Sequence, residues 1–447
     1  MTSLRIVRSI LNEIDSGSNM INYKKLFLPI AILCCWLAHV TTYAQSQGNG
    51  NGAFATGKYR NLFKEQGHAN KEIAKKIETA YQQLFFGDPE TQAIYFPAGR
   101  NEQGNLAYIS DVPHNDIRTE GMSYGMMIAV QLNKKAVFDA LWNYAITYMY
   151  ISYKDHPSEG YFSWSLKRNG EANEETPAPD GEEYFVTALY FASGRWGNGA
   201  GIYNYHQWAD RILTTMRHHP VKTGMTKFGQ RSIGPMVNEG HKMICFVPGI
   251  DRNNFSDPSY HLPHFYELWS RWGPAEDRSF WQAAADTSRV FFIKSTNAVT
   301  GLAPDYANFD GTPHVSRRGG HAQDFSFDSW RTAGNWSVDW LWFGKAPQEH
   351  VLSDRIQGFF ASKGMAQYGC QYTLDGQTML DARHASGLIA TNAVASLAAT
   401  KPIANEFIAA LWNAPVPQVL VERYYDGLLY LMSLLHCSGN YRIYAPK

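Results

Sequence analysis

The stretch Glu120-Gly-Met-Ser-Tyr-Gly-Met-Met-Ile-Ala-Val130 has one charged residue at its start and an apolar continuation. Met122, Met126 and Ala129 within it recur at the spacing of one face of an α-helix. Its two glycines and its serine are small enough to permit close packing against a neighbouring helix. The stretch therefore predicts a buried helix that begins near Glu120.

The same apolar spacing recurs along most of the chain, whereas long alternating strand patterns are scarce. These patterns predict an all-α fold in a single domain, with long Gly-, Pro- and Asn-rich loops between the helices. A toroid of paired helices is one way to arrange so many helices, although periodicity alone does not establish a ring. Further helices are expected at Ile73–Phe85, Val137–Tyr148, Glu182–Ser193, Tyr205–Arg217, His264–Trp272, Arg278–Ile293, Ser329–Trp342, Ile356–Tyr368, Ser386–Ala399 and Val421–Leu435.

The composition excludes several classes of protein. Of 447 residues, 45% are hydrophobic and 14% aromatic, which is unlike a disordered chain. Lys plus Arg and Asp plus Glu each number 40, so the basic excess of a nucleic-acid-binding protein is missing. The many aromatic side chains fit a large core, and they also fit surfaces that stack against the C–H faces of sugars.

The N-terminal region resembles an export signal. Lys24 and Lys25 precede the apolar run Leu26–Ala38, which is shorter than the about 20 residues of a membrane-spanning helix. We expect residues 1–44 to be removed before Gln45, and Met20 is the more natural start of such a signal. Residues 45–53 read as a flexible linker, and residues 54–447 as the folded domain, exported to the periplasm or the exterior.

Several motifs carry little weight by themselves. Gly121-Met-Ser-Tyr-Gly125 matches the serine-hydrolase pattern, but that pattern requires a strand before the serine, and the preceding residues are polar. His261 and His264 lack the accompanying residues of a metal motif, so we expect core or solvated histidines and no metal. Three cysteines remain after residue 44, so at most one disulfide can form among Cys245, Cys370 and Cys437.

Three carboxylates stand among aromatic residues. Glu120 begins an apolar helix, where burial would raise the pKa of its carboxyl group as a general acid requires. Alone, it also fits a helix N-terminal glutamate. For Asp180 and Asp328, local sequence taken alone favours the simpler interpretation of a helix N-cap.

Longer blocks of sequence resemble family 8 of the glycoside hydrolases. Asn115-Asp-Ile-Arg-Thr-Glu-Gly-Met-Ser-Tyr-Gly-Met-Met127 is similar to the motif of the catalytic acid in that family. Matching blocks follow in order across nearly the whole chain after the export signal. They are Gly160–Trp164, Pro177–Tyr184, Asp328–Arg331, His384–Ala393 and Tyr424–Gly427.

The resemblance implies an (α/α)6 barrel and inverting hydrolysis of a β-1,4 bond without a cofactor. Glu120 would be the acid and Asp328 the base, in the arrangement that leaves room for a water between the two. Asp180 would hold the sugar at the cleavage site, and Trp164 would stack against it. Arg331, one helical turn after Asp328, would keep that carboxylate ionised. The matching blocks also assign Arg118, Tyr424 and Tyr425 to substrate binding.

Within the family, the chain is most similar to the branch that releases xylose from the reducing end of xylo-oligosaccharides. In that branch a loop with a histidine blocks the leaving-group side, and His384 matches this histidine. Tyr260 is similar to an aromatic residue on the same side. Ala385 departs from the pattern because a proline is expected after the histidine, and a proline would stiffen the loop by fixing φ. The absence of this proline would allow some endo-cleavage.

Other functions remain open from sequence. An endo-acting xylanase, β-glucanase or chitosanase would use the same carboxylates in an open groove, and a sugar-binding protein would keep the barrel without catalysis. The expected partner is a xylo-oligosaccharide. We expect no nucleic acid, no membrane-embedded segment in the mature protein, and a monomer.

Overall fold

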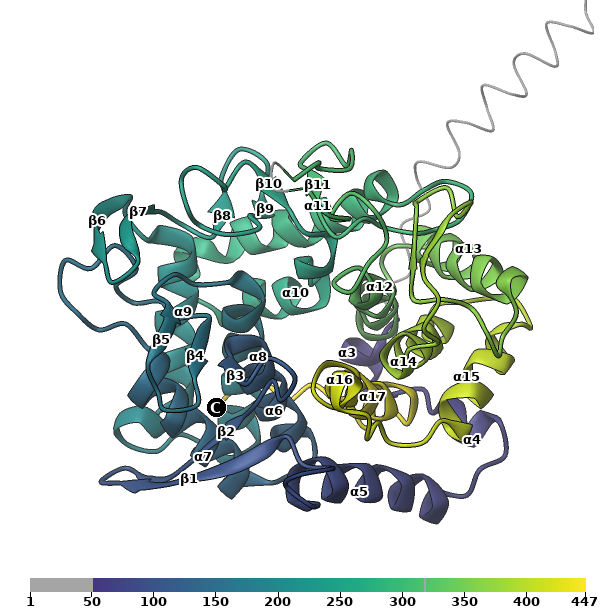
Figure 1. The fold of residues 1–447 in the computed structure, drawn as a ribbon, viewed down its shortest axis with the longest axis horizontal. Coiled ribbons are helices and arrows are strands. Elements are labelled where there is room, and N and C mark those ends of the chain that lie inside the picture. The colour runs from purple at the N-terminus through teal and green to yellow at the C-terminus, as the bar shows by residue number, and fades with distance from the viewer. Residues whose placement is uncertain (1–50, 317–318) are drawn as a thin grey trace, which may run out of the picture. The chain divides into compact units, whose positions relative to one another are not determined.

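The computed structural model describes residues 51–316 and 319–447, and its helices are arranged as two concentric layers (Figure 1). The inner layer is a closed ring, because each inner helix contacts the next and the last returns to the first. Its members are α6 (Thr119–Gln131), α8 (Pro179–Trp196), α10 (Pro263–Trp272), α12 (Trp330–Phe343), α14 (Ser386–Val394) and α17 (Tyr425–Cys437).

Each inner helix is covered on its outer face by one helix of the outer layer. These outer helices are α5 (Asn70–Phe86), α7 (Lys135–Tyr144), α9 (Tyr205–His218), α11 (Arg278–Ser295), α13 (Gln348–Lys363) and α15 (Ala404–Asn413). The arrangement is an (α/α)6 barrel, so the expected all-α fold and toroid are confirmed. The remaining α-helices are short, and they are α3 (Ala53–Thr56), α4 (Leu62–Glu65) and α16 (Leu420–Arg423).

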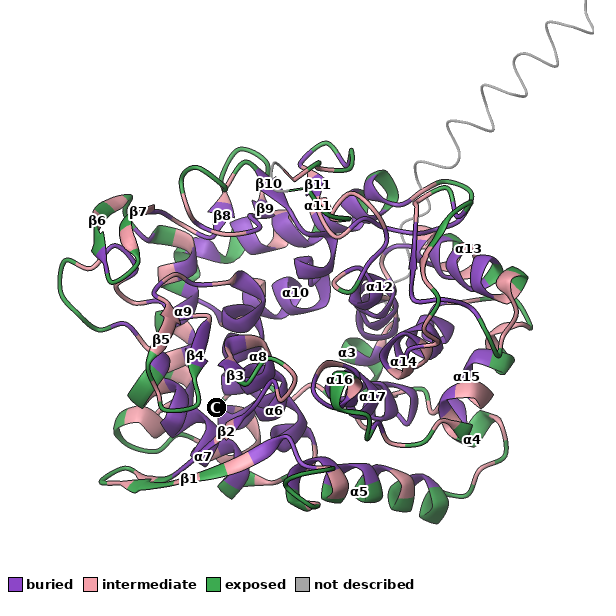
Figure 2. Cartoon of the chain, in the orientation of Figure 1, coloured by how far each residue is buried: buried purple, intermediate pink, exposed green. Residues whose placement is uncertain are grey.

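Burial separates the two layers, as Figure 2 shows. The inner helix α6 is buried at every residue except Glu120. The outer helix α9 buries only one stripe of its surface, at Tyr205, Ala209, Ile212, Leu213 and Met216. A helix that is apolar all round belongs in a core, whereas an amphipathic helix covers it. Glu120, the one residue of α6 that is not buried, therefore marks a point where the core opens.

Small antiparallel sheets lie in the loops that connect the helices. Two of them matter for the site: the sheet β3–β4–β5 and the hairpin β6–β7. The strands are β1 (Tyr95–Asn101), β2 (Gly104–Ile109), β3 (Asp116–Arg118), β4 (Ser165–Lys167), β5 (Ala172–Glu174), β6 (Lys222–Thr226), β7 (Gly229–Ile233), β8 (Val237–Asn238), β9 (Met243–Ile244), β10 (Phe255–Ser256), β11 (Ala307–Asn308), β12 (Gln371–Tyr372) and β13 (Met379–Asp381).

Most expected helices are present, and four differ in extent. The stretch expected at 137–148 is α-helical only to Tyr144, as α7, and continues as the π-helical turn Ala145–Met149. The helix expected at 356–368 begins and ends earlier, as α13, because its apolar stripe continues toward the N-terminus. The stretch 421–435 is broken at Tyr424 into α16 and α17. The stretch 386–399 ends as α14 at Val394 and continues in a 3-10 turn. Helix α15 was not predicted.

The folded domain begins slightly earlier than expected. Residues 1–50, and with them the proposed export signal and most of the expected linker, lie outside the described residues. Ala53 is buried at the start of α3, and the ring of Phe54 stacks on Phe343. The last linker residue is therefore part of the fold. Within the part of the chain that the structure describes, no helix is both long and apolar enough to cross a membrane.

Candidate active site

Glu120 is the residue at which the buried helix α6 opens toward the interior of the ring. Strand β3 leads directly into α6, so Glu120 occupies the first turn of the helix. Its side chain is 14% exposed, and one oxygen, Oε1, accepts a hydrogen bond from the hydroxyl of Tyr424 at 2.9 Å. The other oxygen, Oε2, accepts a hydrogen bond from Arg331 at 3.0 Å.

Arg331 joins the three predicted carboxyl groups, which come from three different inner helices or their N-terminal turns. Its Nη1 lies 3.0 Å from Glu120 Oε2 and 3.2 Å from Asp180 Oδ2, and its Nη2 lies 2.7 Å from Asp328 Oδ1. The guanidinium is planar and always charged, and its donors point in fixed directions. It therefore holds Glu120 and Asp328 at opposite ends of one rigid group.

The charges around Arg331 do not balance, because one guanidinium faces three carboxyl groups. Burial raises the pKa of Glu120 to about 7, and the neighbouring Asp180 and Asp328 add to this increase while Arg331 opposes it. Burial also raises the pKa of Asp180. Glu120 therefore keeps a proton near neutral pH, which is the state of a general acid. The side chain of Asp328 is 32% exposed and so remains accessible to water.

Neither aspartate is a helix N-cap, so the simpler interpretation of both was wrong. The N-cap of α8 is Ala178, and Asp180 lies inside the first turn with its carboxylate on Arg331. The N-cap of α12 is Ser329, and the Asp328 carboxylate also turns to Arg331. Tertiary contacts therefore direct both carboxylates away from the helix ends.

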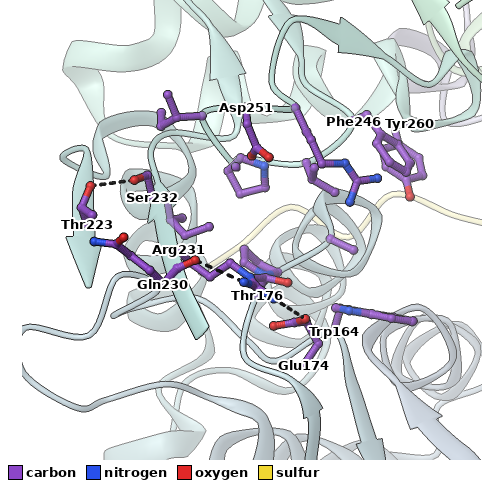
Figure 3. A pocket seen from close by; sticks show the side chains of 18 of the residues that line it. Trp164, Glu174, Thr176, Thr223, Gln230, Arg231, Ser232, Phe246, Asp251 and Tyr260 are labelled. Carbon is purple, nitrogen blue, oxygen red and sulfur yellow. Dashed lines mark hydrogen bonds and ion pairs between the residues drawn. The ribbon is translucent and has the colours of Figure 1, made fainter. Parts of the chain in front are cut away.

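A cavity of about 960 Å³ opens beside Asp328. Trp164 and Tyr260 lie on opposite walls of it, and Phe246 lies beside Tyr260 (Figure 3). Tyr306 also lines it. The size is that of a ligand site, and rings facing each other suit the apolar faces of sugars.

Tyr260 and His384, which the resemblance places on one side, have different neighbours in the structure. Tyr260 lines the cavity with Trp164 and Asp328, whereas His384 is not among the residues that line it. The Nδ1 of His384 lies 2.9 Å from the carbonyl oxygen of Tyr368, whose ring meets the imidazole edge-on.

The remaining predicted binding residues surround the carboxyl groups. Arg118 pairs with Asp111 and Asp116 and lies over the ring of Trp164, at 5.7 Å from its centroid. Tyr424 contacts Glu120, as described above. The hydroxyl of Tyr425 donates to the carbonyl oxygen of Phe327, the residue before Asp328. Arg118 therefore supports Trp164, and the tyrosines support the two carboxyl groups.

The discarded motifs have structural roles. A short strand does precede Ser123, contrary to expectation, but the serine is buried inside α6 and its hydroxyl donates to the carbonyl oxygen of Glu120. His261 and His264 are buried in the core, and burial lowers the pKa of each. No cluster of side chains suited to a metal occurs among the residues that the structure describes.

Sequence reasoning missed two polar partners of Arg331. Its Nη1 donates to the hydroxyl of Tyr124 at 2.9 Å, and its Nη2 donates to the hydroxyl of Ser259 at 2.9 Å. Tyr124 lies one helical turn after Glu120, so helical spacing could have found it. Ser259 lies in the short 3-10 helix Pro258–Tyr260, and nothing in its local sequence indicates the contact.

The sequence of the chain matches a known family. A model described as glycosyl hydrolases family 8 matches residues 103–439, which include all three carboxyl groups and Arg331. The chain belongs to glycoside hydrolase family 8. It is therefore a glycoside hydrolase.

The relatives agree in fold and are similar over nearly their whole length. The reducing-end xylose-releasing exo-oligoxylanase Rex8A of Paenibacillus barcinonensis is 44% identical over 88% of this chain and 99% of its own. A reducing end xylose-releasing exo-oligoxylanase of Halalkalibacterium halodurans is also 44% identical, over 89% and 97%. A solved family 8 xylanase of Teredinibacter turnerae, a catalytic mutant in complex with xylohexaose, is 50% identical with a TM-score of 0.87, over 88% of this chain and 100% of that one.

Proposed function

We propose that the protein is an inverting glycoside hydrolase that releases xylose from the reducing end of β-1,4-xylo-oligosaccharides. The observation that carries the proposal is the contact of one guanidinium, Arg331, with Glu120, Asp180 and Asp328, the last of which lines an aromatic-walled cavity. The names of the two relatives at 44% identity support the choice of substrate and of the reducing end.

The proposed chemistry uses the two carboxyl groups that Arg331 holds apart, Glu120 and Asp328. The pKa of Glu120 is raised to about 7, so its protonated form is available near neutral pH to donate a proton to the glycosidic oxygen as the bond from that oxygen to the anomeric carbon breaks. Asp328 accepts a proton from a water that attacks the same carbon from the opposite face. Inverting enzymes hold the two carboxyl groups about 6.5–9.5 Å apart to leave room for this water. Asp180 completes the site by contacting Arg331 beside the sugar.

Product analysis with end-labelled substrate tests the proposal. Xylotriose that carries ¹³C at its reducing-end anomeric carbon should yield labelled xylose and unlabelled xylobiose, with the xylobiose formed first as the α anomer. Proton NMR during the reaction follows both. Initial β-xylobiose would contradict inversion, and label in the disaccharide would contradict release from the reducing end. Binding of xylotetraose without turnover would instead favour a sugar-binding protein.

Endo-cleavage is a second candidate, and Ala385 favours it. The residue stands where a stiffening proline is expected next to His384, and the solved relative at 50% identity is named as a xylanase in complex with xylohexaose. A loop that opens would admit a longer chain. A rapid fall in the viscosity of polymeric xylan would support endo-action, whereas slow release of xylose without viscosity loss supports exo-action.

Export and oligomeric state complete the proposal. The basic and apolar pattern of Lys24–Ala38, followed by small residues up to Ala44, supports cleavage before Gln45 and a location in the periplasm or outside the cell. Mass spectrometry of the exported protein should find Gln45 at its N-terminus. The protein is also proposed to be a monomer, and light scattering of the purified protein checks the mass.

A further inference from the structure

The 3-10 turn Pro258–Tyr260 lies against the guanidinium that joins the three carboxyl groups. The hydroxyl of Ser259 accepts a hydrogen bond from Arg331, and the centroid of the Tyr260 ring lies 5.6 Å from the guanidinium carbon. Tyr260 also lines the cavity beside Asp328 (Figure 3). The position of this short turn therefore affects both Arg331 and one wall of the cavity.

Two buried side chains connect this turn to helix α8. The hydroxyl oxygen of Tyr266, on α10, lies 3.0 Å from the carbonyl oxygen of Tyr260 and 2.6 Å from Oε1 of Glu183, on α8. Glu183 and Tyr266 have no exposed surface. Glu183 follows Asp180 by three residues, but the reaction described above uses neither Glu183 nor Tyr266. We call the connection from Glu183 through Tyr266 to the carbonyl of Tyr260 the Glu183–Tyr266 chain.

The number of protons in this chain indicates the state of Glu183. Both contacts of the Tyr266 hydroxyl are at hydrogen-bond distance, yet a phenol has one proton and donates one hydrogen bond. The carbonyl of Tyr260 can only accept, and an ionised Glu183 can also only accept. Both contacts are hydrogen bonds together only if Glu183 is protonated. The acid then donates to the hydroxyl oxygen of Tyr266, which donates to the carbonyl.

The surroundings of Glu183 favour the same state. Its Oε2 is buried and has no hydrogen-bond partner among the described residues, which is far more costly for an anion than for a neutral acid. Burial raises the pKa of Glu183 well above its usual range. The charges of Asp180 and Asp257 act in the same direction, whereas Arg331 and the bond from Tyr266 oppose them. The neutral acid is therefore the form that fits this position.

We propose that Glu183 is a positioning residue, which keeps its proton and holds the turn of Tyr260 against Arg331 through Tyr266. Loss of the chain would release the carbonyl of Tyr260 and, with the turn, the hydroxyl that Ser259 presents to Arg331. A shift of about 1 Å at a catalytic group can lower a rate about 100-fold. The effect on turnover rests on the proposed function, whereas the protonation of Glu183 does not.

Infrared spectroscopy tests the protonation without any substrate. Near neutral pH, the spectrum of the unmodified protein minus that of Glu183→Gln should contain the C=O stretch of a protonated carboxyl group. Glutamine has nearly the same size and also offers a donor to Tyr266, so this variant should fold. Carboxylate bands in place of the C=O stretch would show that Glu183 is ionised and would overturn the proposal.

Kinetics on xylotriose test the positioning role. Tyr266→Phe keeps the ring but breaks the chain, so it should lower kcat about tenfold and change KM less. Glu183→Gln is the conservative variant that preserves the chain, and its kcat should stay close to that of the unmodified protein. The fall of its activity at alkaline pH should also occur at the same pH, because no charge beside Asp180 is removed.

Thr187→Val is the matched control. The Oγ1 of Thr187, one turn after Glu183 on α8, accepts a hydrogen bond from the indole N–H of Trp269 on α10 at 3.0 Å. This variant weakens the contact between the same two helices but leaves the Glu183–Tyr266 chain in place. It should lower the melting temperature and leave kcat unchanged.

The contrary results are distinct. An unchanged kcat in Tyr266→Phe, or an equal loss of kcat in Thr187→Val, would show that the chain does not position the turn. A fall of activity at lower pH in Glu183→Gln would show that an ionised Glu183 had been raising the pKa of Glu120, and it would overturn the protonated state. If the proposed function fails instead, the unmodified protein does not cleave xylotriose, and the infrared C=O stretch is still present.

Discussion

Arg331 controls the charge balance at the level of single residues. It is buried, and its guanidinium contacts Glu120, Asp180 and Asp328 together. Its fork geometry fixes the direction of each contact, which an ammonium group does not do. The arrangement leaves the site with more carboxyl groups than positive charges, so a proton is retained. The acid and the base thus differ through their surroundings, although both are ordinary carboxyl groups.

Removing either carboxyl function should stop turnover. Glu120→Gln leaves no proton to donate, and Asp328→Asn leaves no base, so each change should lower kcat by about 10²- to 10⁴-fold. Rates of xylose release from xylotriose give the result, and melting temperatures near that of the unmodified protein show that the fold is intact. A variant that turns over normally would show that its residue has another role.

The pH dependence of activity should reflect the titration of Glu120. Burial raises the pKa of this carboxyl to about 7, and the general acid must be protonated. The kcat/KM should therefore fall as the pH rises through about 7, by about tenfold per pH unit beyond it. A pH profile on xylotriose gives the measurement. A profile that stays flat to about pH 9 would mean that Glu120 is not the titrating acid.

At the level of elements, the contact between α14 and α17 depends on a buried acid. Asp426 of α17 accepts a hydrogen bond from the backbone N–H of Gly387 in the first turn of α14, at 2.7 Å. The helices approach so closely here that a Cβ on Gly387 would lie 3.1 Å from Asp426. Burial raises the pKa of Asp426 to about 7. The protonated acid therefore fits the fold better than the carboxylate does.

Asp426→Asn should make stability less dependent on pH. The pKa of Asp426 rises from 3.8 in the unfolded chain to about 7 in the folded protein. The stabilisation that the protonated acid gives to the folded state is therefore complete below pH 3.8 and is lost as the pH rises through about 7. The neutral amide keeps the acceptor and never ionises. At about pH 8 the variant should be more stable than the unmodified protein, by up to a few kcal/mol in the free energy of unfolding. At about pH 3.5 the two proteins should be equally stable. Thermal unfolding at several pH values checks this. A variant less stable at both values would contradict it.

The loop before α14 can accept the missing proline. Ala385 has φ −70°, which is the value that a proline ring imposes, and its N–H makes no backbone hydrogen bond among the described residues. Ala385→Pro should therefore raise stability by about 0.4–1 kcal/mol through a smaller entropy of the unfolded chain. It should also reduce any viscosity loss of polymeric xylan while xylotriose turnover persists. Ala382→Pro is a control in the same loop but further from His384, and it should leave the viscosity result unchanged.

At the level of the whole molecule, packing provides the stability of the described domain. Cys245, Cys370 and Cys437 are all free and buried. Burial raises the pKa of Cys245 and of Cys370 to about 12. Thiols in this state react poorly because the thiolate is the reactive form.

A reducing agent should therefore have no effect on a preparation that begins at Gln45. We expect the same melting temperature with and without dithiothreitol, since no bond among the three cysteines is available to break. A chromogenic disulfide reagent should modify the thiols only after denaturant is added. A lower melting temperature under reduction, or fast modification of the folded protein, would show that the thiols are not buried as described.

The sequence by itself determined the helices, since apolar residues at helical spacing have few other ways to bury their faces. It also identified Glu120, Asp180, Asp328 and Arg331, because long motifs carry them in order. It gave the extent of a helix less well where the pattern was broken, as at Tyr424.

Only the tertiary structure decided which side chains meet. Glu120 and Arg331 lie 211 residues apart in sequence, and ring closure brings them within 3.0 Å. Local sequence favoured N-caps for Asp180 and Asp328. The structure overrode these because a buried guanidinium must find carboxylates to compensate its charge. Contacts between distant segments, such as Ser259 on Arg331 and Glu174 on Arg231, depend on how loops pack over the barrel, and no local pattern encodes that packing.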